Sequence, residues 1–531
     1  MLYYFVYFLM LAYTIFISRR TLHMLQQNLY NENNRYIKWI LKNNDITIFN
    51  VSLIAIVLSI GITIFKDNTI IQFLLLLIMG VYVLSYYEEK KIVATNQNKK
   101  PLVYTKRIKR LIVTLSIVYI LPIALAIIFP NLKNILLIVS TILTGFSFFT
   151  TFIALIINKP VEKAVYNHFE KMAKEKLESF SNLKVIGITG SYGKTSCKNI
   201  LNDILSIKYN TLATPKSLNT FNGLMMTINN TLSKFDDVFI AEMGAYVQGE
   251  INGLCDLVNP KYGIITSIGT AHLETFGSES AIQHGKMELI EHLPHDGVGV
   301  LNMDDPKQVS YKIKNDCKII WIGIENKNAD VVASNIRTEG TKTLFDVTFP
   351  GDKNKYEFET RLLGRHNIYN ILSALALGYE FKIPIKDLIL ATRRVKPIEH
   401  RLELKRLGNF YQIDDAYNSN PVGAKSALDV LNTMDGFKVI VTPGMIELGK
   451  KEYELNKEFG KQISEVADLT ILIGKKQTKP ILDGLKEAGY PEEKLMVLND
   501  VRESFTIINN LNKKKDVYAL YENDLPDTYN E

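Results

Sequence analysis

Cysteine and intramembrane charge are scarce in this 531-residue chain, and each shortage excludes a class of protein. The three cysteines, Cys197, Cys255 and Cys317, are far apart and form no C-x-x-C pair. They argue against a zinc ribbon and against a secreted disulfide framework, and they suit a reducing compartment. The apolar runs near the N-terminus contain no Asp, Glu, Lys or Arg. This absence argues against a proton relay or an ion pathway, and therefore against a transporter.

The net charge of +7 is unevenly distributed along the chain. Residues 1–160 hold 16 Lys and Arg against 5 Asp and Glu, whereas the rest of the chain is slightly acidic. The basic excess therefore belongs to the N-terminal part, and a nucleic-acid partner is not needed to explain it. A chain of this length with 47% apolar residues is expected to form two to four domains.

Five apolar runs in residues 1–160 approach the roughly 20 residues that cross a bilayer. They are Leu2–Ile17, Thr47–Phe65, Thr69–Tyr87, Leu111–Phe129 and Ile135–Ile157. The first run lacks a basic leader and a small-residue cleavage site, so it predicts an anchor in preference to a signal peptide. We expect about five transmembrane helices, which either anchor the chain or also hold a lipid-linked substrate.

The charges of the connecting loops predict the orientation of these helices. Segments 18–46 and 88–110 hold five and eight Lys or Arg, whereas links 66–68 and 130–134 hold one lysine each. The positive-inside rule then places the N-terminus outside and everything after Ile157 in the cytoplasm. Residues 161–182 are polar with helical periodicity, which predicts a connecting helix.

The stretch Lys184–Lys198, KVIGITGSYGKTSCK, combines a short apolar strand, a Gly-rich turn and the start of a helical pattern. This arrangement is typical of a phosphate-binding loop: glycines admit phosphate to backbone N–H groups, Lys194 supplies charge, and Thr195 offers a hydroxyl to Mg²⁺. Ile188 stands where the usual eight-residue pattern has its first glycine, so the rule is only partly met. An incidental Gly-rich turn is the alternative.

Residues 183–395 alternate strand-like runs with helical patterns, which predicts an α/β domain with a mostly parallel, doubly wound sheet. The expected strands are Val185–Thr189, Thr211–Thr214, Val238–Met243, Tyr262–Ile268, Val298–Asn302 and Ile319–Ile324. Functional groups should lie where such strands end. Glu242, His272 and Asn302 stand there, and a carboxylate such as Glu242 near a phosphate loop suits Mg²⁺.

Two further regions complete the predicted architecture. Residues 331–362 alternate like β-hairpins. Residues 396–531 are expected to form a smaller α/β domain. Its predicted strands are Phe410–Ile413, Val439–Thr442, Thr470–Ile473 and Met496–Leu498.

Nine ordered segments over about residues 183–515 resemble the Mur ligases. They are GITGSYGKTS, FIAEMGAYVQGEI, TSIGTAHLETFGS, HGKMELIEHLP, VLNMDDP, GRHNIYNILSALA, HRLE, DDAYNSNPVGAKSALDVL and GMIELG. The last two resemble most closely the branch that adds D-alanyl-D-alanine to a muramyl tripeptide. The resemblance implies an enzyme of bacterial peptidoglycan synthesis, in which residues 331–362 form an excursion from the central domain. Together with the apolar runs and the loop charges, this predicts a multi-pass protein of the cytoplasmic membrane with cytoplasmic catalytic domains.

The resemblance also implies roles for individual residues. The expected ATP-binding residues are Gly190, Ser191, Gly193, Lys194, Thr195, Ser196, Asn302, His366, Asn367, Asn370, Arg401 and Asp415. Two Mg²⁺ ions would be held by Thr195, Glu242, His272 and Lys286, with Lys286 carbamylated by CO₂ into a carboxylate-like ligand. Lys194, His272, Lys286 and Arg401 would be catalytic, and Tyr417, Asn418 and Asn420 would line the side of the incoming amine.

Two departures from the family pattern concern the substrates. Apolar runs replace the soluble N-terminal domain that usually grips a UDP-sugar, so the muramyl peptide could be UDP-linked or lipid-linked. Leu520–Asp524 replaces an expected Lys-Gly-Ser-Arg stretch, which leaves the incoming amine open.

The resemblance implies an ADP-forming ligase in which ATP phosphorylates a carboxylate and an amine attacks the acyl phosphate. The alternatives are a ligase for another precursor, or a silent nucleotide-binding scaffold, against which the full set of metal-site residues argues.

Overall fold

The computed structural model describes the whole chain except residues 96–100, 340–341, 417–419, 447, 449–450, 512–513 and 524–531. The chain folds as two units, Met1–His168 and Phe169–Glu531. Helix α8 (Ser147–Glu178) begins in the first unit and ends in the second. The predicted connecting helix is thus the second half of one helix that begins among the apolar residues.

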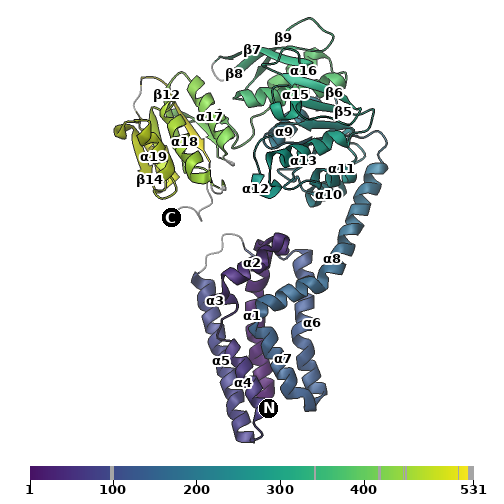
Figure 1. Cartoon of the computed structure of the whole chain (residues 1–531), viewed down its shortest axis with the longest axis vertical. Helices are drawn as coiled ribbons and strands as arrows, with labels where there is room; N and C mark the ends of the chain where they lie inside the picture. The colour runs from purple at the N-terminus through teal and green to yellow at the C-terminus, as the bar shows by residue number, and fades with distance from the viewer. Residues whose placement is uncertain are drawn as a thin grey trace. The chain divides into compact units, whose positions relative to one another are not determined.

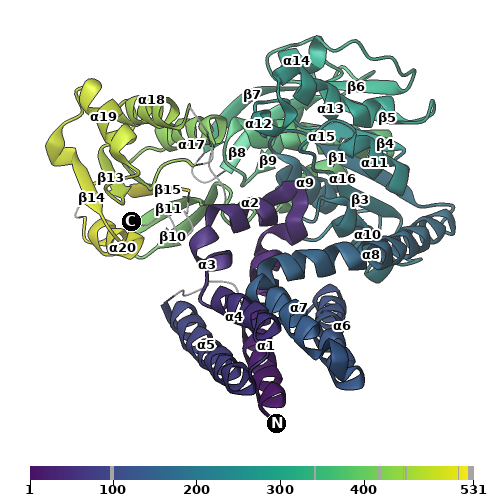
Figure 2. The same cartoon turned by 60° about the horizontal axis from the view of Figure 1, so that its bottom comes forward.

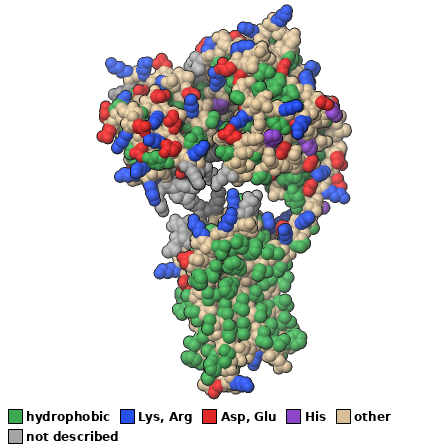
Figure 3. All heavy atoms as spheres, viewed as in Figure 1, with side chains coloured by type: hydrophobic (Ala, Val, Ile, Leu, Met, Phe, Trp, Pro, Cys, Tyr) green, Lys and Arg blue, Asp and Glu red, His purple; other side chains and the backbone are tan. Residues whose placement is uncertain are grey.

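The first unit is helical and displays apolar side chains over most of the surface seen in Figure 3. Before α8 it contains α1 (Leu2–Gln27), η1 (Leu29–Asn34), α2 (Arg35–Lys42), α3 (Asn44–Thr47), α4 (Leu53–Ile64), α5 (Asn68–Thr95), α6 (Lys106–Ile128), η2 (Pro130–Leu132) and α7 (Lys133–Gly145). Helix α1 packs against α5, and α4 packs against both α5 and α7 (Figure 1).

Three of these helices, α1, α5 and α6, are long and apolar enough to cross a membrane. Helices α7 and α8 form a pair bent by 93° that counts as a fourth span if it crosses as one. Helix α4 has only 12 residues, about 18 Å of helix. The expected count of about five is therefore approximate, because one apolar run gives a short helix and another a sharply bent pair.

A buried ion pair joins α1 to α5. The Arg20 guanidinium donates to Glu89 Oε2 at 2.5 Å, and the two side chains are 9% and 4% exposed. Both residues lie just beyond the apolar runs, so the sequence shows charged helix ends but not that they pair. An ion pair inside an apolar bundle fixes which helix faces meet, because any other register would bury an unpaired charge.

The first sheet of the second unit has nine strands in the order β2-β3-β1-β4-β5-β6-β7-β8-β9. They are β1 (Lys184–Thr189), β2 (Thr211–Ala213), β3 (Val238–Glu242), β4 (Tyr262–Ile265), β5 (Val298–Asn302), β6 (Lys318–Gly323), β7 (Val331–Glu339), β8 (Lys342–Thr348) and β9 (Tyr356–Thr360). The pairs from β2 to β7 are parallel, as predicted. Strands β7–β9 pair antiparallel and extend this sheet, so the expected excursion is instead its edge.

Helices cover this sheet on both faces. They are α9 (Lys194–Leu205), α10 (Phe221–Asn230), α11 (Glu250–Val258), α12 (Leu273–Phe276), α13 (Glu279–Glu291), α14 (Pro306–Val309), α15 (Arg365–Glu380) and α16 (Ile385–Arg394). Alternate residues of β1, Ile186 and Ile188, share one core with α9, α15 and α16. The opposite face of β1 and β4 packs against α13. Such two-sided burial explains the nearly continuous apolar strands.

The second sheet has six strands in the order β10-β11-β15-β12-β13-β14. They are β10 (Glu403–Leu407), β11 (Phe410–Asp415), β12 (Phe437–Thr442), β13 (Leu469–Ile473), β14 (Leu495–Leu498) and β15 (Val517–Glu522). Helices α17 (Pro421–Thr433), α18 (Glu452–Ser464), α19 (Lys479–Glu487) and α20 (Val501–Asn509), with η4 (Glu492–Lys494), accompany them (Figures 1 and 2). The sequence predicted four of these strands and missed β10 and the central β15.

Candidate functional site

The loop between β1 and α9 has the backbone of a phosphate cradle. Gly190 and Gly193 have φ of 149° and 82°, a region that side chains other than glycine rarely adopt. A Cβ on Gly190 would also lie 2.1 Å from Thr266 Oγ1. Lys194 Nζ folds back onto the carbonyl oxygen of Gly190 at 2.7 Å. Helix α9 begins at Lys194, so its free N–H groups face this loop.

Glu242, the last residue of β3, lies beside this loop. Thr195 Oγ1 donates to Glu242 Oε1 at 3.1 Å, as does Asn219 Nδ2. Glu242 is buried, and β3 pairs with β1 so that Glu242 lies opposite Ile188. Because β1 and β3 are adjacent and parallel, the Glu242 carboxylate at the end of β3 lies close to the Thr195 hydroxyl that follows β1. The sequence predicted that a carboxylate at this strand end would lie near the loop.

Three glycines that are neighbours across adjacent strands allow α13 to pack close to the sheet. Gly187, Gly263 and Gly299 are neighbours across β1, β4 and β5. A Cβ on any of them would lie within 3.1 Å of a Leu289 or Ile290 side-chain atom of α13. The missing side chains thus let this helix, which carries Lys286, lie against the sheet.

Lys286 is a buried amine with little to stabilise its charge. Its side chain is 1% exposed, and Nζ donates to the carbonyl oxygen of Ala245 at 3.2 Å. Burial, and then the nearby charge of Lys194, lower its pKa from 10.5 to about 7, against the opposing effect of Glu250 and Glu288. A large fraction of Lys286 is therefore a neutral, nucleophilic amine near pH 7.

His272 belongs to the same site and immediately precedes α12. Its backbone has φ of 61°, and its ring lies 4.4 Å from that of Tyr246 between centroids. Burial and the charges of Lys286 and Lys194 lower the pKa of His272. The imidazole is accordingly neutral near pH 7, as a metal ligand must be.

Arg401 and Asp415 come from the C-terminal part of the chain. The Arg401 charge, like burial, lowers the pKa of Lys194, which places the arginine within electrostatic reach of the phosphate loop. Asp415 ends β11 and accepts from the N–H of Leu402 at 3.2 Å. Burial raises its pKa to about 6, although Arg401 opposes this rise.

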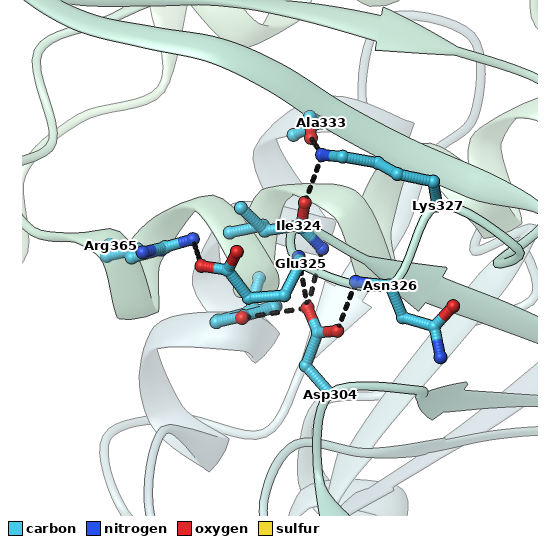
Figure 4. A network of polar contacts seen from close by, with 8 residues as sticks. Asp304, Ile324, Glu325, Asn326, Lys327, Ala333 and Arg365 are labelled. Carbon is cyan, nitrogen blue, oxygen red and sulfur yellow. Dashed lines mark hydrogen bonds and ion pairs between the residues drawn. The ribbon is translucent and has the colours of Figure 1, made fainter.

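Asp304, which follows β5, organises the turn after β6. Its carboxylate accepts from the N–H groups of Ile324, Glu325 and Asn326 at 2.6 to 2.9 Å and from the Tyr369 hydroxyl at 2.9 Å (Figure 4). Asn302 accepts in turn from the N–H of Asp304 at 3.0 Å. Burial alone would raise the pKa of Asp304, but the three N–H donors hold it below its ordinary value.

Asp304→Asn is expected to lower the free energy of unfolding by about 2–3 kcal/mol at pH 7, because an amide leaves some of the N–H donors unpaired. A lowered carboxyl pKa contributes stability above the unfolded pKa, and this stability is lost as pH falls through the folded pKa. The gap to the parent should therefore close in acid. Unfolding can be followed by Trp321 fluorescence in a Trp39→Phe background. Asp316→Asn, at a side chain 84% exposed, is the control expected to unfold with the parent.

The remaining predicted site residues lie at different places in the second unit. Asn370 Oδ1 lies beside Gly193, 3.2 Å from where a Cβ would be. Asn367 is buried on α15 and donates to the Leu363 carbonyl oxygen, and His366 Nδ1 lies 2.9 Å from Ser426 Oγ. Asn420 caps α17 through the Gly423 N–H, a structural role that the sequence did not suggest. Tyr417 and Asn418 lie outside the described residues.

Ser191 and Ser196 are both buried at the loop and the first turn of α9. The N–H of Ser191 donates to the Ser267 carbonyl oxygen at 2.7 Å.

Sequence reasoning pointed to the strand end that holds Asp304 but missed Lys198 and Asn219. Lys198 lies one helical turn after Lys194, on the same face of α9, and this spacing could have indicated that both reach the site.

The described residues contain no group of three His, Cys, Asp or Glu side chains that could hold a metal. The predicted metal residues supply one carboxylate, one hydroxyl, one imidazole and the Lys286 amine. Two Mg²⁺ ions prefer more anionic oxygen ligands than Glu242 alone provides. The set would fit Mg²⁺ with Lys286 as a carbamate, and the low pKa of this amine suits that modification.

Two family models match the second unit. The Mur ligase middle domain matches residues 188–378, and the Mur ligase, glutamate ligase domain matches residues 400–520. The UDP-N-acetylmuramoyl-tripeptide–D-alanyl-D-alanine ligases of Bacillus subtilis (strain 168) and Escherichia coli (strain K12) are 32% and 31% identical over 56% and 55% of this chain. These alignments span 63% and 65% of the relatives, so the chain covers less than two thirds of their length.

Two solved structures each resemble about two thirds of this chain. MurF from Acinetobacter baumannii has a TM-score of 0.60 at 26% identity, over 67% of this chain and 77% of that one. MurF ligase from Thermotoga maritima, in complex with ADP, has a TM-score of 0.59 at 25% identity, over 67% and 80%.

Proposed function

Because the chain belongs to the Mur ligase family through its middle and C-terminal domains, we propose that it is an ATP-dependent ligase of cell-wall precursor synthesis. The observation that supports this most is the meeting of a phosphate loop, the Thr195–Glu242 contact and the low-pKa amine of Lys286. The proposed substrates are D-alanyl-D-alanine and a muramyl tripeptide, after the names of the relatives. The reaction would be ADP-forming and would make a C–N bond.

The chemistry requires activation, because a carboxylate oxygen is too poor a leaving group for an amine to displace. In the proposed reaction the substrate carboxylate attacks the γ-phosphorus of ATP, which releases ADP and forms an acyl phosphate. The amine then attacks the acyl carbon, and phosphate leaves. The loop N–H groups and Lys194 would stabilise the charge that develops on the transferred phosphoryl group.

The residues around the phosphate loop would divide the remaining work. Arg401 and Asp415 would contact the nucleotide from the C-terminal domain, and Asn302, His366, Asn367 and Asn370 would line its base. Thr195, Glu242, His272 and carbamylated Lys286 would hold Mg²⁺, which supplies charge neutralisation and orientation of the phosphates. A buried low-pKa lysine would serve no purpose in a nucleotide-binding scaffold, so this residue favours a ligase over a silent protein.

We also propose that the first unit lies in the bacterial cytoplasmic membrane. Its candidate spans support membrane association, and the basic segments 18–46 and 88–110 favour a cytoplasmic second unit. With the N-terminus outside, the number of crossings must be odd. An apolar first unit also favours a second candidate substrate, a lipid-linked muramyl peptide, whose lipid would lie in the same membrane.

The test is ligation by the full chain purified in detergent, with ATP, D-alanyl-D-alanine and either a UDP-linked or a lipid-linked muramyl tripeptide. We expect phosphate release coupled to pentapeptide formation, measured by mass spectrometry. Product with the UDP form supports the named activity, and product with the lipid form alone gives the first unit a role in substrate binding. Product with neither form, in protein that still binds ATP, would overturn the proposed substrate.

A further inference from the structure

Lys198 forms a buried ion pair with Glu242 that the proposed reaction does not use. Lys198 Nζ lies 3.0 Å from Glu242 Oε2, and both side chains are 1% exposed. The contacts at Glu242 are thus divided: Oε1 accepts from Thr195 and Asn219, and Oε2 accepts from Lys198. A lysine is a costly partner at this depth, since its ammonium is strongly hydrated in water.

The same ammonium also holds the loop between β2 and α10. Lys198 Nζ donates to the carbonyl oxygen of Lys216, a residue with a left-handed backbone at φ of 49°. Asn219, from this loop, donates to the other oxygen of Glu242. The loop is therefore tied to the carboxylate directly through Asn219 and indirectly through Lys198, and it adopts an uncommon backbone conformation at Lys216.

The ammonium group of Lys198 beside this carboxylate has an electrostatic consequence. Glu242 is the only carboxylate side chain among the proposed Mg²⁺ ligands, and the ammonium groups of Lys198 and Lys194 both lie near it. With Lys198 paired to it, Glu242 presents little net negative charge to a cation. A divalent ion would thus gain little at this site until a ligand with several negative charges, such as a triphosphate, arrives with it.

We propose that Lys198 is a positioning residue that orients Glu242, ties it to the 214–220 loop, and keeps the affinity for a free divalent cation low. The cation then enters together with the nucleotide. This inference rests on the metal role proposed for Glu242. It extends that role in two ways: Lys198 balances the charge of Glu242, and the divalent cation binds together with the nucleotide and not before it.

The test is Mn²⁺ binding to the full chain in detergent without nucleotide, measured by electron paramagnetic resonance. Lys198→Gln keeps a hydrogen-bond donor but removes the charge, and we expect it to bind Mn²⁺ at least about tenfold more tightly than the parent. Asn219→Ala cuts the other tie to the loop without a change in charge, and it is expected to stay within about twofold of the parent. Equal affinities of the parent and a folded Lys198→Gln protein would overturn the proposal.

Two further variants keep the outcomes distinct. Lys198→Arg retains the charge, so it should bind Mn²⁺ as weakly as the parent. A tenfold gain there would overturn the proposal even if Lys198→Gln fails to fold. Adding Glu242→Gln to Lys198→Gln should remove the gain. A gain that survives Glu242→Gln would contradict the metal role of Glu242, and therefore the proposed function at this site, whereas a gain that never appears contradicts only the role of Lys198.

Discussion

Lys286→Met is expected to abolish ligation and, at the same time, to make the folded protein more stable at pH 7. The side chain is 1% exposed and donates to one backbone oxygen at 3.2 Å. A buried ammonium in this position costs folding free energy, and methionine of similar length removes that cost. Without a carbamate, the site also loses the anionic ligand that Mg²⁺ would need, so ligation should fall by at least about a thousandfold.

The stability change has a defined dependence on pH. The lowering of the Lys286 pKa from 10.5 to about 7 corresponds to a ceiling of roughly 4 to 5 kcal/mol. Between about pH 7 and pH 10.5 the unfolded chain binds a proton at Lys286 that the folded protein does not. The parent protein therefore gains stability as pH rises through this range. The advantage of Lys286→Met should be greatest at or below pH 7 and should vanish towards pH 10.5.

The measurement is urea unfolding in CO₂-free buffer, followed by Trp321 fluorescence with Trp39→Phe as the common background. Trp39 and Trp321 lie in different units, so this background reports on the second unit alone. Added bicarbonate should stabilise and activate the parent, because a carbamate replaces the repelled cation, and should leave Lys286→Met unchanged. Substantial ligation by Lys286→Met, or a parent indifferent to bicarbonate, would show that Lys286 is not a metal ligand.

Lys194→Ala is expected to reduce ligation and ATP turnover by about a thousandfold or more while the protein stays folded. Lys194 Nζ lies on the carbonyl oxygens of its own loop, at 2.7 Å from Gly190 and 3.4 Å from Ser191. Burial lowers its pKa, and Arg401 adds to this effect, whereas Glu242 opposes it. Removal of this partly desolvated cation should therefore reduce the stabilisation of the transition state.

Phosphate release and product formation measure this loss. Lys208→Ala is the matched control, since Lys208 follows the same helix and is exposed. Among the contacts described, its side chain reaches only the Lys382 carbonyl oxygen and the Tyr209 ring. It should retain the activity of the parent. Retained turnover in Lys194→Ala, with the control equally active, would remove the phosphate loop from the proposed mechanism.

Local chemistry allowed much of this molecule to be predicted from its sequence. Alternating and β-branched apolar residues predicted strands β1–β6 of the sheet, because buried parallel strands need such side chains on both faces. Gly190, Gly193, Lys194 and Thr195 are neighbours in the chain, so their loop was recognisable without any long-range information. The strands of residues 331–362 were also predicted, but not that they extend the same sheet, since pairing between distant strands leaves no local signal.

Contacts between distant residues were decided by the tertiary structure alone. The pairing of Lys198 with Glu242, 44 residues apart, follows from the register of β1 and β3 and from the pitch of α9. The low pKa of Lys286 arises because three glycines in register let α13 approach the sheet, and burial then acts on its amine. Arg20 and Glu89 looked like ordinary charged helix ends, and only the packing of α1 against α5 made them a buried pair. Sequence determined which groups are present, and the fold determined which of them lose water and meet, because desolvation and pairing depend on neighbours that the chain brings from far away.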